Sequence, residues 1–152
     1  MKNSKGYTFF LIFFLAITAG ILLALKIIGA NINKEPQVKF PKGTIYVEIV
    51  QTPETRNQGL SDRKTLEKNH GMLFIFDKAS NYSFWMNKMN FNLDFIFIAD
   101  NKIVDLIENV PYPQNGETPV SVKSEKQFNS ILEVNAGVVK LLKLKIGDPV
   151  IY

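Results

Sequence analysis

Residues 71–98 read GMLFIFDKASNYSFWMNKMNFNLDFIFI, and this stretch decides the fold. It is dense in large apolar residues and contains the only tryptophan of the chain, Trp85. Met72 to Phe76 and Ser83 to Met86 are short strand candidates on either side of a polar turn. Asp94 to Ala99 is a third, and its uniformly apolar character predicts a strand buried on both faces. The stretch therefore predicts the core of a β-rich domain.

Further strands are predicted on both sides of this stretch. Apolar and polar residues alternate in Thr44 to Gln51, which is typical of a strand with one buried face. Asp100-Asn101 tolerates positive φ and follows an apolar run, so it predicts a hairpin to Lys102 to Val110. Ser130 to Val134 is predicted to form another strand. Pro149 to Tyr152 can close the sheet as an edge strand, because proline lacks the amide that an inner strand needs.

Two short helices and one long loop complete the predicted domain. Thr52-Pro53-Glu54 has the residues of a helix start, and Gly59 can end that helix. Ala136 to Leu144 has the spacing of a second short helix. Pro111 to Lys126 predicts a long irregular connection. The expected fold is α+β, a small and mostly antiparallel β domain, partly closed barrel or sandwich-like, with two short helices behind an N-terminal transmembrane helix.

The N-terminal region predicts a membrane anchor. Residues 7–25 carry no charge, and a helix of this length spans roughly the 30 Å of bilayer hydrocarbon. We assign residues 7–28 to the anchor. Lys2 and Lys5 place residues 1–6 in the cytoplasm and the C-terminal domain outside, in a single-pass arrangement. A basic start and an apolar core also describe a signal peptide, so secretion after cleavage stays open.

Residues 29–43 are polar, contain Pro36 and Pro41, and are predicted to form a flexible tether. Residues 44–152 then form one domain, too short for two independent cores. Residues 36–152 hold 14 Lys and Arg against 13 Asp and Glu, so this part is nearly neutral. A nucleic-acid binder needs a basic face, and nucleic acid is not an expected partner. The chain has no cysteine, which excludes disulfides and thiolate metal sites.

Several short blocks occur in a fixed order: Gly59-Leu60 with Arg63, Gly71-Met72-Leu73-Phe74, Phe84-Trp85-Met86, Leu93-Asp94 with Phe97, Leu132-Glu133 with Gly137, and Gly147-Asp148 with Val150. With these blocks the chain resembles the DUF192 family, small bacterial and archaeal proteins without an assigned activity. The resemblance implies a compact β-rich domain, often behind a signal peptide or membrane anchor, and it implies no catalytic residues. Two positions depart from the family pattern, because Asn87 stands where lysine is usual and Asn92 where proline is usual.

Asp94 and Glu133 are the sharpest candidates for chemistry, because each is a carboxylate within an apolar strand sequence. A structural role requires hydrogen bonds from backbone amides or a base such as Arg63. A functional role requires the two groups to converge on a groove, as in glycoside hydrolysis. His70 is the only histidine, which argues against a catalytic triad and against a zinc site. No metal or cofactor is expected.

Trp85 stands between Phe84 and Met86, so on a strand it faces away from both. It either packs beneath the loop at residues 111–126 or floors a ligand groove, where its flat ring can stack on a sugar. In the second case Lys88 and Arg63 would supply charge at the rim.

The favoured hypothesis is a membrane-tethered extracytoplasmic binding or accessory module of the cell envelope, not an enzyme. Its groove near Trp85, Arg63, Lys88 and Asp94 would hold a small polar ligand, an envelope glycan or an envelope protein. The alternative is an envelope-polymer hydrolase that uses Asp94 and Glu133. A purely structural subunit would instead show a broad apolar surface.

Overall fold

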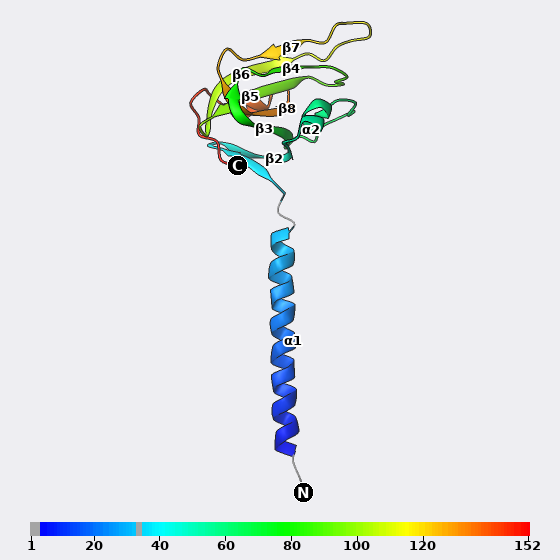
Figure 1. Cartoon of the computed structure of the whole chain (residues 1–152), viewed down its shortest axis with the longest axis vertical. Helices are drawn as coiled ribbons and strands as arrows, with labels where there is room; N and C mark the ends of the chain where they lie inside the picture. The colour runs from blue at the N-terminus through cyan, green and yellow to red at the C-terminus, as the bar shows by residue number, and fades with distance from the viewer. Residues whose placement is uncertain (1–3, 33–34) are drawn as a thin grey trace. The chain divides into compact units, whose positions relative to one another are not determined.

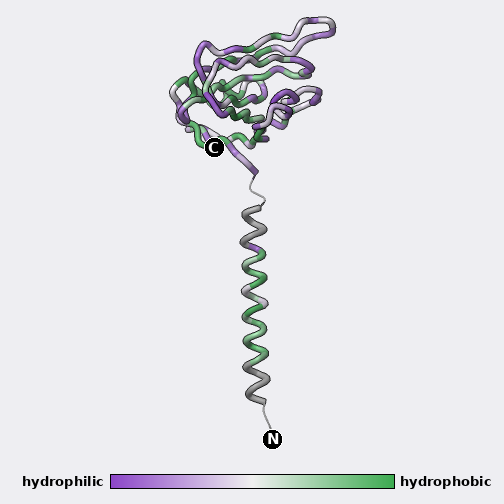
Figure 2. The backbone as a smooth tube through the Cα atoms, viewed as in Figure 1, coloured by the Kyte–Doolittle hydropathy of each residue, from purple (hydrophilic) through white to green (hydrophobic). Residues whose placement is uncertain are grey.

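The computed structural model describes the backbone of residues 4–32 and 35–152, and the side chains of residues 10–26 and 35–152. The chain divides into two compact units, Met1–Glu35 and Pro36–Tyr152. The first contains helix α1, Ser4–Ile32, and the second contains all the strands (Figure 1). Figure 2 shows hydrophobic residues along the described part of α1 and in the central strands.

Helix α1 covers the region of the predicted anchor. Within the described part of the chain, no helix combines the length and the hydropathy that crossing a membrane requires. The predicted anchor at residues 7–28 lies partly outside the described side chains, which in this region cover residues 10–26. Residues 1–3 of the predicted cytoplasmic N-terminus and residues 33–34 of the predicted tether also lie outside the described residues.

Pro36–Tyr152 is a mostly β domain whose main sheet curls into a half-barrel (Figure 1). The order of its six strands is β1-β2-β3-β8-β5-β6. All neighbours are antiparallel except β2 and β3, which are parallel. The strands are β1 (Gln37–Phe40), β2 (Gly43–Val50), β3 (His70–Ser80), β8 (Phe128–Asn135), β5 (Leu93–Ala99) and β6 (Lys102–Val110).

The C-terminal segment links the two edges of this sheet. Ile151 pairs with Lys39 of β1, and Pro149 pairs with Lys102 of β6. The predicted closing strand at residues 149–152 is therefore present only as two isolated bridges. Pro149 has no amide hydrogen to donate, which prevents a continuous ladder at this point.

The alternation of side chains along the strands divides the core between the two faces of the sheet. One face buries an aliphatic cluster that includes Leu73, Ile96 and Leu132 and packs against the short helix α3, Val138–Leu141. The other face buries an aromatic cluster beneath a two-stranded sheet of β4 (Ser83–Trp85) and β7 (Ser121–Lys123). Strand β5 is buried from Leu93 to Ile98, so the predicted strand with two buried faces is confirmed.

Helix α2, Pro53–Gln58, connects the parallel strands β2 and β3. The Thr52 hydroxyl accepts the Thr55 amide, the Thr55 side chain accepts the Thr52 amide, and Pro53 occupies the first turn. Gly59 ends the helix with a φ of 49°. This helix was predicted correctly, and it places Arg56 and Asn57 opposite β4.

Two segments differ from the prediction. Residues 37–40 lie in the predicted tether but form β1, because Val38 and Phe40 are buried on one side of the strand. The prolines at 36 and 41 favoured the prediction of a tether, although apolar and polar residues alternate in the four positions between them. The predicted irregular loop at 111–126 contains β7, whose Val122 is buried in the aromatic cluster. The hairpin turn Asp100-Asn101 was correct, with φ values of 51° and 56°.

Candidate ligand-binding site

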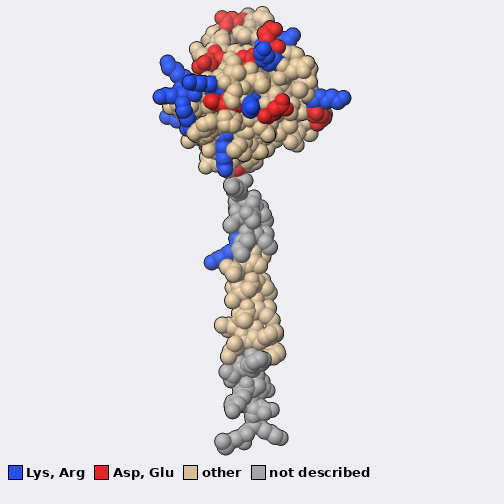
Figure 3. All heavy atoms as spheres, turned by 90° about the vertical axis from the view of Figure 1, so that its left-hand side faces the viewer, with Lys and Arg blue, Asp and Glu red and all other residues tan. Residues whose placement is uncertain are grey.

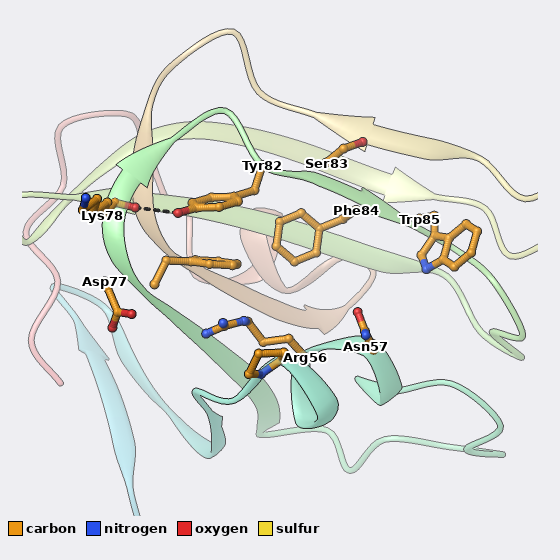
Figure 4. A pocket seen from close by; sticks show the side chains of 10 residues that line it. Arg56, Asn57, Asp77, Lys78, Tyr82, Ser83, Phe84 and Trp85 are labelled. Atoms are coloured by element: carbon orange, nitrogen blue, oxygen red, sulfur yellow. Dashed lines mark hydrogen bonds between the residues drawn. The ribbon is translucent and has the colours of Figure 1, made fainter.

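A cleft of about 520 Å³ separates α2 from the end of β3 and from β4. Figure 4 shows Arg56 and Asn57 rising from α2 on one side, with Tyr82, Phe84 and Trp85 on the other. Three segments that are separate in the sequence meet at this cleft. Its lining consists of Pro53, Arg56 and Asn57, then Phe76, Asp77 and Lys78, and finally Tyr82, Ser83, Phe84 and Trp85.

Trp85 lies at one end of this cleft with 65% of its surface exposed. It ends β4 and pairs with Ser121 of β7, so its backbone is fixed while its ring remains accessible. The interpretation that Trp85 packs beneath the loop at residues 111–126 is therefore wrong. Its neighbour Met86 is fully buried and anchors the end of the strand in the core.

Arg56 carries a positive charge that is held in place within the cleft. Its Nη1 donates to the carbonyl oxygens of Gln51, at 2.5 Å, and Ile75, at 2.9 Å. Its guanidinium carbon lies 4.9 Å from the ring centroid of Phe76, a cation–π contact. Among the described residues no carboxylate forms an ion pair with Arg56, so its other N–H groups can donate to a ligand.

Stacked aromatic rings form the wall of the cleft. The rings of Phe76 and Tyr82 stack with centroids 3.9 Å apart, and the Tyr82 hydroxyl donates to the Lys78 carbonyl oxygen at 2.9 Å (Figure 4). Phe84 meets Phe74 edge to face at 5.4 Å. Because these contacts connect the wall to the aromatic cluster, the wall is rigid before any ligand arrives.

A smaller pocket of about 40 Å³ adjoins the cleft. Arg56, Asn57, Phe84 and Trp85 line both spaces. Its other walls combine polar residues, among them Gln58 and Ser61, with apolar ones such as Phe74 and Leu93, and Glu133 of β8 is its one carboxylate. We call this space the side pocket.

Glu133 has only 6% of its surface exposed. Its carboxyl group has no hydrogen-bond or ion-pair partner among the residues that the structure describes. Burial raises the pKa of Glu133 from 4.5 to about 8, since the charged form has lost its water. At neutral pH the group is therefore a neutral acid that can both donate and accept a hydrogen bond.

Asp94 is fully buried and satisfied by the backbone. Its Oδ1 accepts the Asn109 amide at 2.8 Å, and its Oδ2 accepts the amides of Gly137 and Val139, both at 2.9 Å. These bonds tie β5 to β6 and to the start of α3. Asp94 thus organises the fold and lines neither the cleft nor the side pocket.

The sheet register separates Asp94 from Glu133. Glu133 is the cross-strand partner of Phe95, and Asp94 is the partner of Val134. Because successive side chains of a strand point to opposite faces, the two carboxyl groups lie on opposite sides of the sheet. They cannot flank one glycosidic bond, as the hydrolase hypothesis requires.

The other predicted site residues lie outside both spaces. Arg63 forms a bidentate ion pair with Glu48 at 2.5 and 2.7 Å, and Lys88 lies 3.9 Å from Asp62. His70 begins β3, near Glu67 and the Tyr46 ring. Within the described residues no cluster of three metal-ligating side chains occurs.

Sequence reasoning identified Trp85 and Glu133 but missed Arg56, Asn57 and Tyr82. Arg56 and Asn57 stand on the polar surface of a short helix, where a charged residue is ordinary. The one signal for them is the position of α2 between the strands β2 and β3. Because these strands are parallel, the connection that contains α2 must cross over the sheet and brings Arg56 and Asn57 close to the next strand.

Comparisons with known proteins show the family of the chain and two solved structures of similar fold. Residues 37–152 match the family DUF192, described as Uncharacterized ACR, COG1430. No match was found among curated proteins. A crystal structure of a "putative transcription regulator" from Sinorhizobium meliloti 1021 is 31% identical with a TM-score of 0.67, covering 76% of this chain and 89% of that chain. One of a protein of unknown function from Novosphingobium aromaticivorans DSM 12444 is 27% identical with a TM-score of 0.65, covering 76% and 82%. The chain belongs to the DUF192 family.

Proposed function

We propose that the domain is a saccharide-binding module of the cell envelope, in which the cleft beside Trp85 holds a sugar ring. The observation that carries this proposal is the exposure of Trp85, 65%, at the end of a cleft whose opposite side presents Arg56 and Asn57. The exposed indole ring offers a flat apolar surface, and covering that surface with a ligand is favourable. A sugar ring offers an apolar face for the indole and hydroxyl groups for polar side chains.

The polar groups of the cleft suit hydroxyl recognition. Arg56 supplies donors only, Asp77 supplies acceptors, and Asn57 and Ser83 supply both. Arg56 is fixed by two carbonyl oxygens and by Phe76, so little side-chain entropy is lost when a ligand binds. Figure 3 shows another face of the domain, on which Lys and Arg side chains gather at one edge and lie beside Asp and Glu elsewhere.

Binding is favoured over hydrolysis for this cleft. Glycoside hydrolysis commonly needs two carboxyl groups on either side of the scissile bond. The register of β5 and β8 removes Asp94 from the face that carries Glu133. The chain is therefore proposed as a binding or accessory protein.

The proposal includes a location. The uncharged run at residues 7–25, preceded by Lys2 and Lys5, supports an anchor at residues 7–28 with the domain outside the membrane. Extraction of membranes with alkaline carbonate tests this. An anchored chain stays in the pellet, whereas a chain released to the supernatant at reduced mass shows signal cleavage and secretion.

Calorimetry of the full chain in detergent micelles tests the binding function. We expect saturable binding of a β-1,4-linked tetrasaccharide, cellotetraose or its 2-acetamido equivalent. Trp85→Ala should weaken binding at least about tenfold while the circular dichroism spectrum is retained, since stacking on an aromatic ring contributes on the order of 1 kcal/mol or more. Leu141→Ala is the matched control, because Leu141 is 75% exposed on α3 and lines neither space. Failure of both saccharides to bind, or equal affinity in Trp85→Ala, would overturn the proposal.

A further inference from the structure

Glu133 is the one buried polar side chain of the site whose role the fold does not explain. It is 94% buried, as its 6% exposure shows, and it lines the side pocket without a partner among the described residues. An unpaired buried carboxyl group costs stability, so it calls for a role outside the packing of the fold, and ligand binding is such a role. Asp94, on the next strand, shows the contrast, because three backbone amides satisfy it.

The chemistry of the side pocket selects its occupant. A neutral carboxyl group offers one O–H donor and one carbonyl acceptor side by side, which matches the acceptor and donor of an amide. Arg56 on the pocket wall disfavours a cation. A ligand carboxylate could accept from Arg56, but it would leave the carbonyl oxygen of Glu133 without a donor from the ligand. The apolar part of the wall, which includes Phe74, Met89 and Leu93, suits a methyl group.

We propose that the side pocket receives the acetamido group of an N-acetylated amino sugar, with Glu133 hydrogen-bonded to its amide and Trp85 against the sugar ring. This inference rests on the saccharide-binding function proposed above. It narrows the ligand class to envelope glycans that carry N-acetyl groups.

The connection between the two spaces supports this assignment. An acetamido group is attached directly to the sugar ring, so the ring and the group must occupy adjoining sites. Phe84 and Trp85 form part of both the cleft and the side pocket. The side pocket, at about 40 Å³, exceeds the roughly 10–15 Å³ that one water needs, so it can take a group of a few heavy atoms.

The protonation of Glu133 controls the charge at its end of the side pocket, as the residues that face it show. Strands β3 and β5 present Met72 and Phe95 as its cross-strand partners. The segment after β4 contributes Met89 to the pocket, and the turn after α2 contributes Leu60 and Ser61. Arg56 is the other charged residue that lines this pocket among the described residues.

Three tetrasaccharides of the same β-1,4 linkage test the inference by calorimetry on the full chain in detergent. They differ at C2, which carries acetamido, hydroxyl or free amino groups. At pH 7 we expect the acetylated sugar to bind at least about tenfold more tightly than the hydroxylated one, the effect of one or two buried hydrogen bonds. Glu133→Leu should lose this preference and still bind the hydroxylated sugar through Trp85.

Glu133→Gln supplies a second readout, because its amide also donates and accepts. It should keep the preference for the acetylated sugar, and between pH 7 and pH 9 its preference should stay constant while that of the native chain falls several-fold. Equal affinities of the three sugars, a preference for the free amine, or a preference that survives in Glu133→Leu would overturn the inference and leave the saccharide-binding function standing. Binding of none of the three would overturn both.

Discussion

Asp94 and Glu133 lie on the adjacent strands β5 and β8 but project from opposite faces of the sheet, because the cross-strand partner of Glu133 is Phe95. On one face, Asp94 is saturated by backbone amides. On the other, Glu133 is unpartnered and reaches the side pocket. Two carboxylates with similar sequence surroundings therefore have different roles, one in the fold and one in the candidate site.

Asp94→Asn should destabilise the domain without changing saccharide affinity. An amide side chain retains one acceptor oxygen and places an NH₂ group against backbone N–H donors. The expected loss in the free energy of unfolding is about 2–4 kcal/mol, measured by urea denaturation. Asp62→Asn is the control, because Asp62 is 64% exposed and its pair with Lys88 spans 3.9 Å. A loss in Asp94→Asn as small as that of this control would contradict the assigned role.

The stability of the domain should fall as pH rises, because of Glu133. Burial raises its pKa from 4.5 to about 8, so between these values the unfolded chain releases a proton that the folded chain keeps. The contribution of Glu133 to the free energy of unfolding is complete below pH 4.5, declines up to about pH 8 and stays constant above it. The loss from this group between pH 4.5 and pH 7 is roughly 3 kcal/mol.

Glu133→Gln is the test of this pH dependence. The variant should be more stable than the native chain at pH 7, and its free energy of unfolding should lack the decline attributed to this group. Denaturation curves at pH 5, 6, 7 and 8 for both proteins provide the comparison. Parallel pH profiles for the two proteins would show that the Glu133 carboxyl group has a partner in solution.

The two arginines of the chain provide a matched pair. Arg56 lines the cleft, whereas Arg63 pairs with Glu48 away from it. Arg56→Lys should weaken saccharide binding about tenfold, because lysine lacks the planar guanidinium, whose Nη1 bonds two carbonyl oxygens while its other N–H groups stay free for a ligand. Arg63→Lys should leave binding unchanged and cost at most about 1 kcal/mol, since its ion pair is exposed. Calorimetry and urea denaturation measure both, and equal binding losses in the two variants would contradict the placement of the site.

Gly71→Ala should destabilise the sheet next to Glu133. A Cβ at Gly71 would lie 2.7 Å from the backbone oxygen of Glu133 and 2.9 Å from Cγ1 of Val134. The backbone oxygen belongs to the β3–β8 ladder and cannot move away, so we expect a loss of about 1–3 kcal/mol in urea denaturation. In Gly43→Ala the added Cβ meets the side chain of Leu142, which can change rotamer. A loss at Gly43 equal to that at Gly71 would contradict this steric account.

Local patterns were sufficient to predict most elements of the domain. The start of α2 at Thr52-Pro53, its end at Gly59 and the Asp100-Asn101 turn all depend on residues close in sequence. The uniformly apolar β5 was also correctly predicted as buried on both faces. The short strand β1 was missed, because four residues between two prolines give too little alternation to detect.

The candidate site was less accessible to prediction, because it depends on register and on contacts between distant elements. No local pattern shows that Glu133 pairs with Phe95, which fixes the face of the sheet on which it lies. Arg56 becomes part of the site only because the parallel pairing of β2 and β3 brings α2 toward the end of β3 and toward β4. In the sequence, Arg63 and Lys88 looked equally suitable as ligand-binding residues, but each lies beside a carboxylate outside the site.

The fluorescence of Trp85 during a saccharide titration tests the central claim most directly. Trp85 is the only tryptophan and is 65% exposed at the cleft, so the emission of the full chain in detergent reports this site alone. We predict a saturable blue shift as the tetrasaccharide of N-acetylated sugars covers the indole. An emission maximum that stays constant up to millimolar saccharide would contradict the proposal that this cleft binds a sugar.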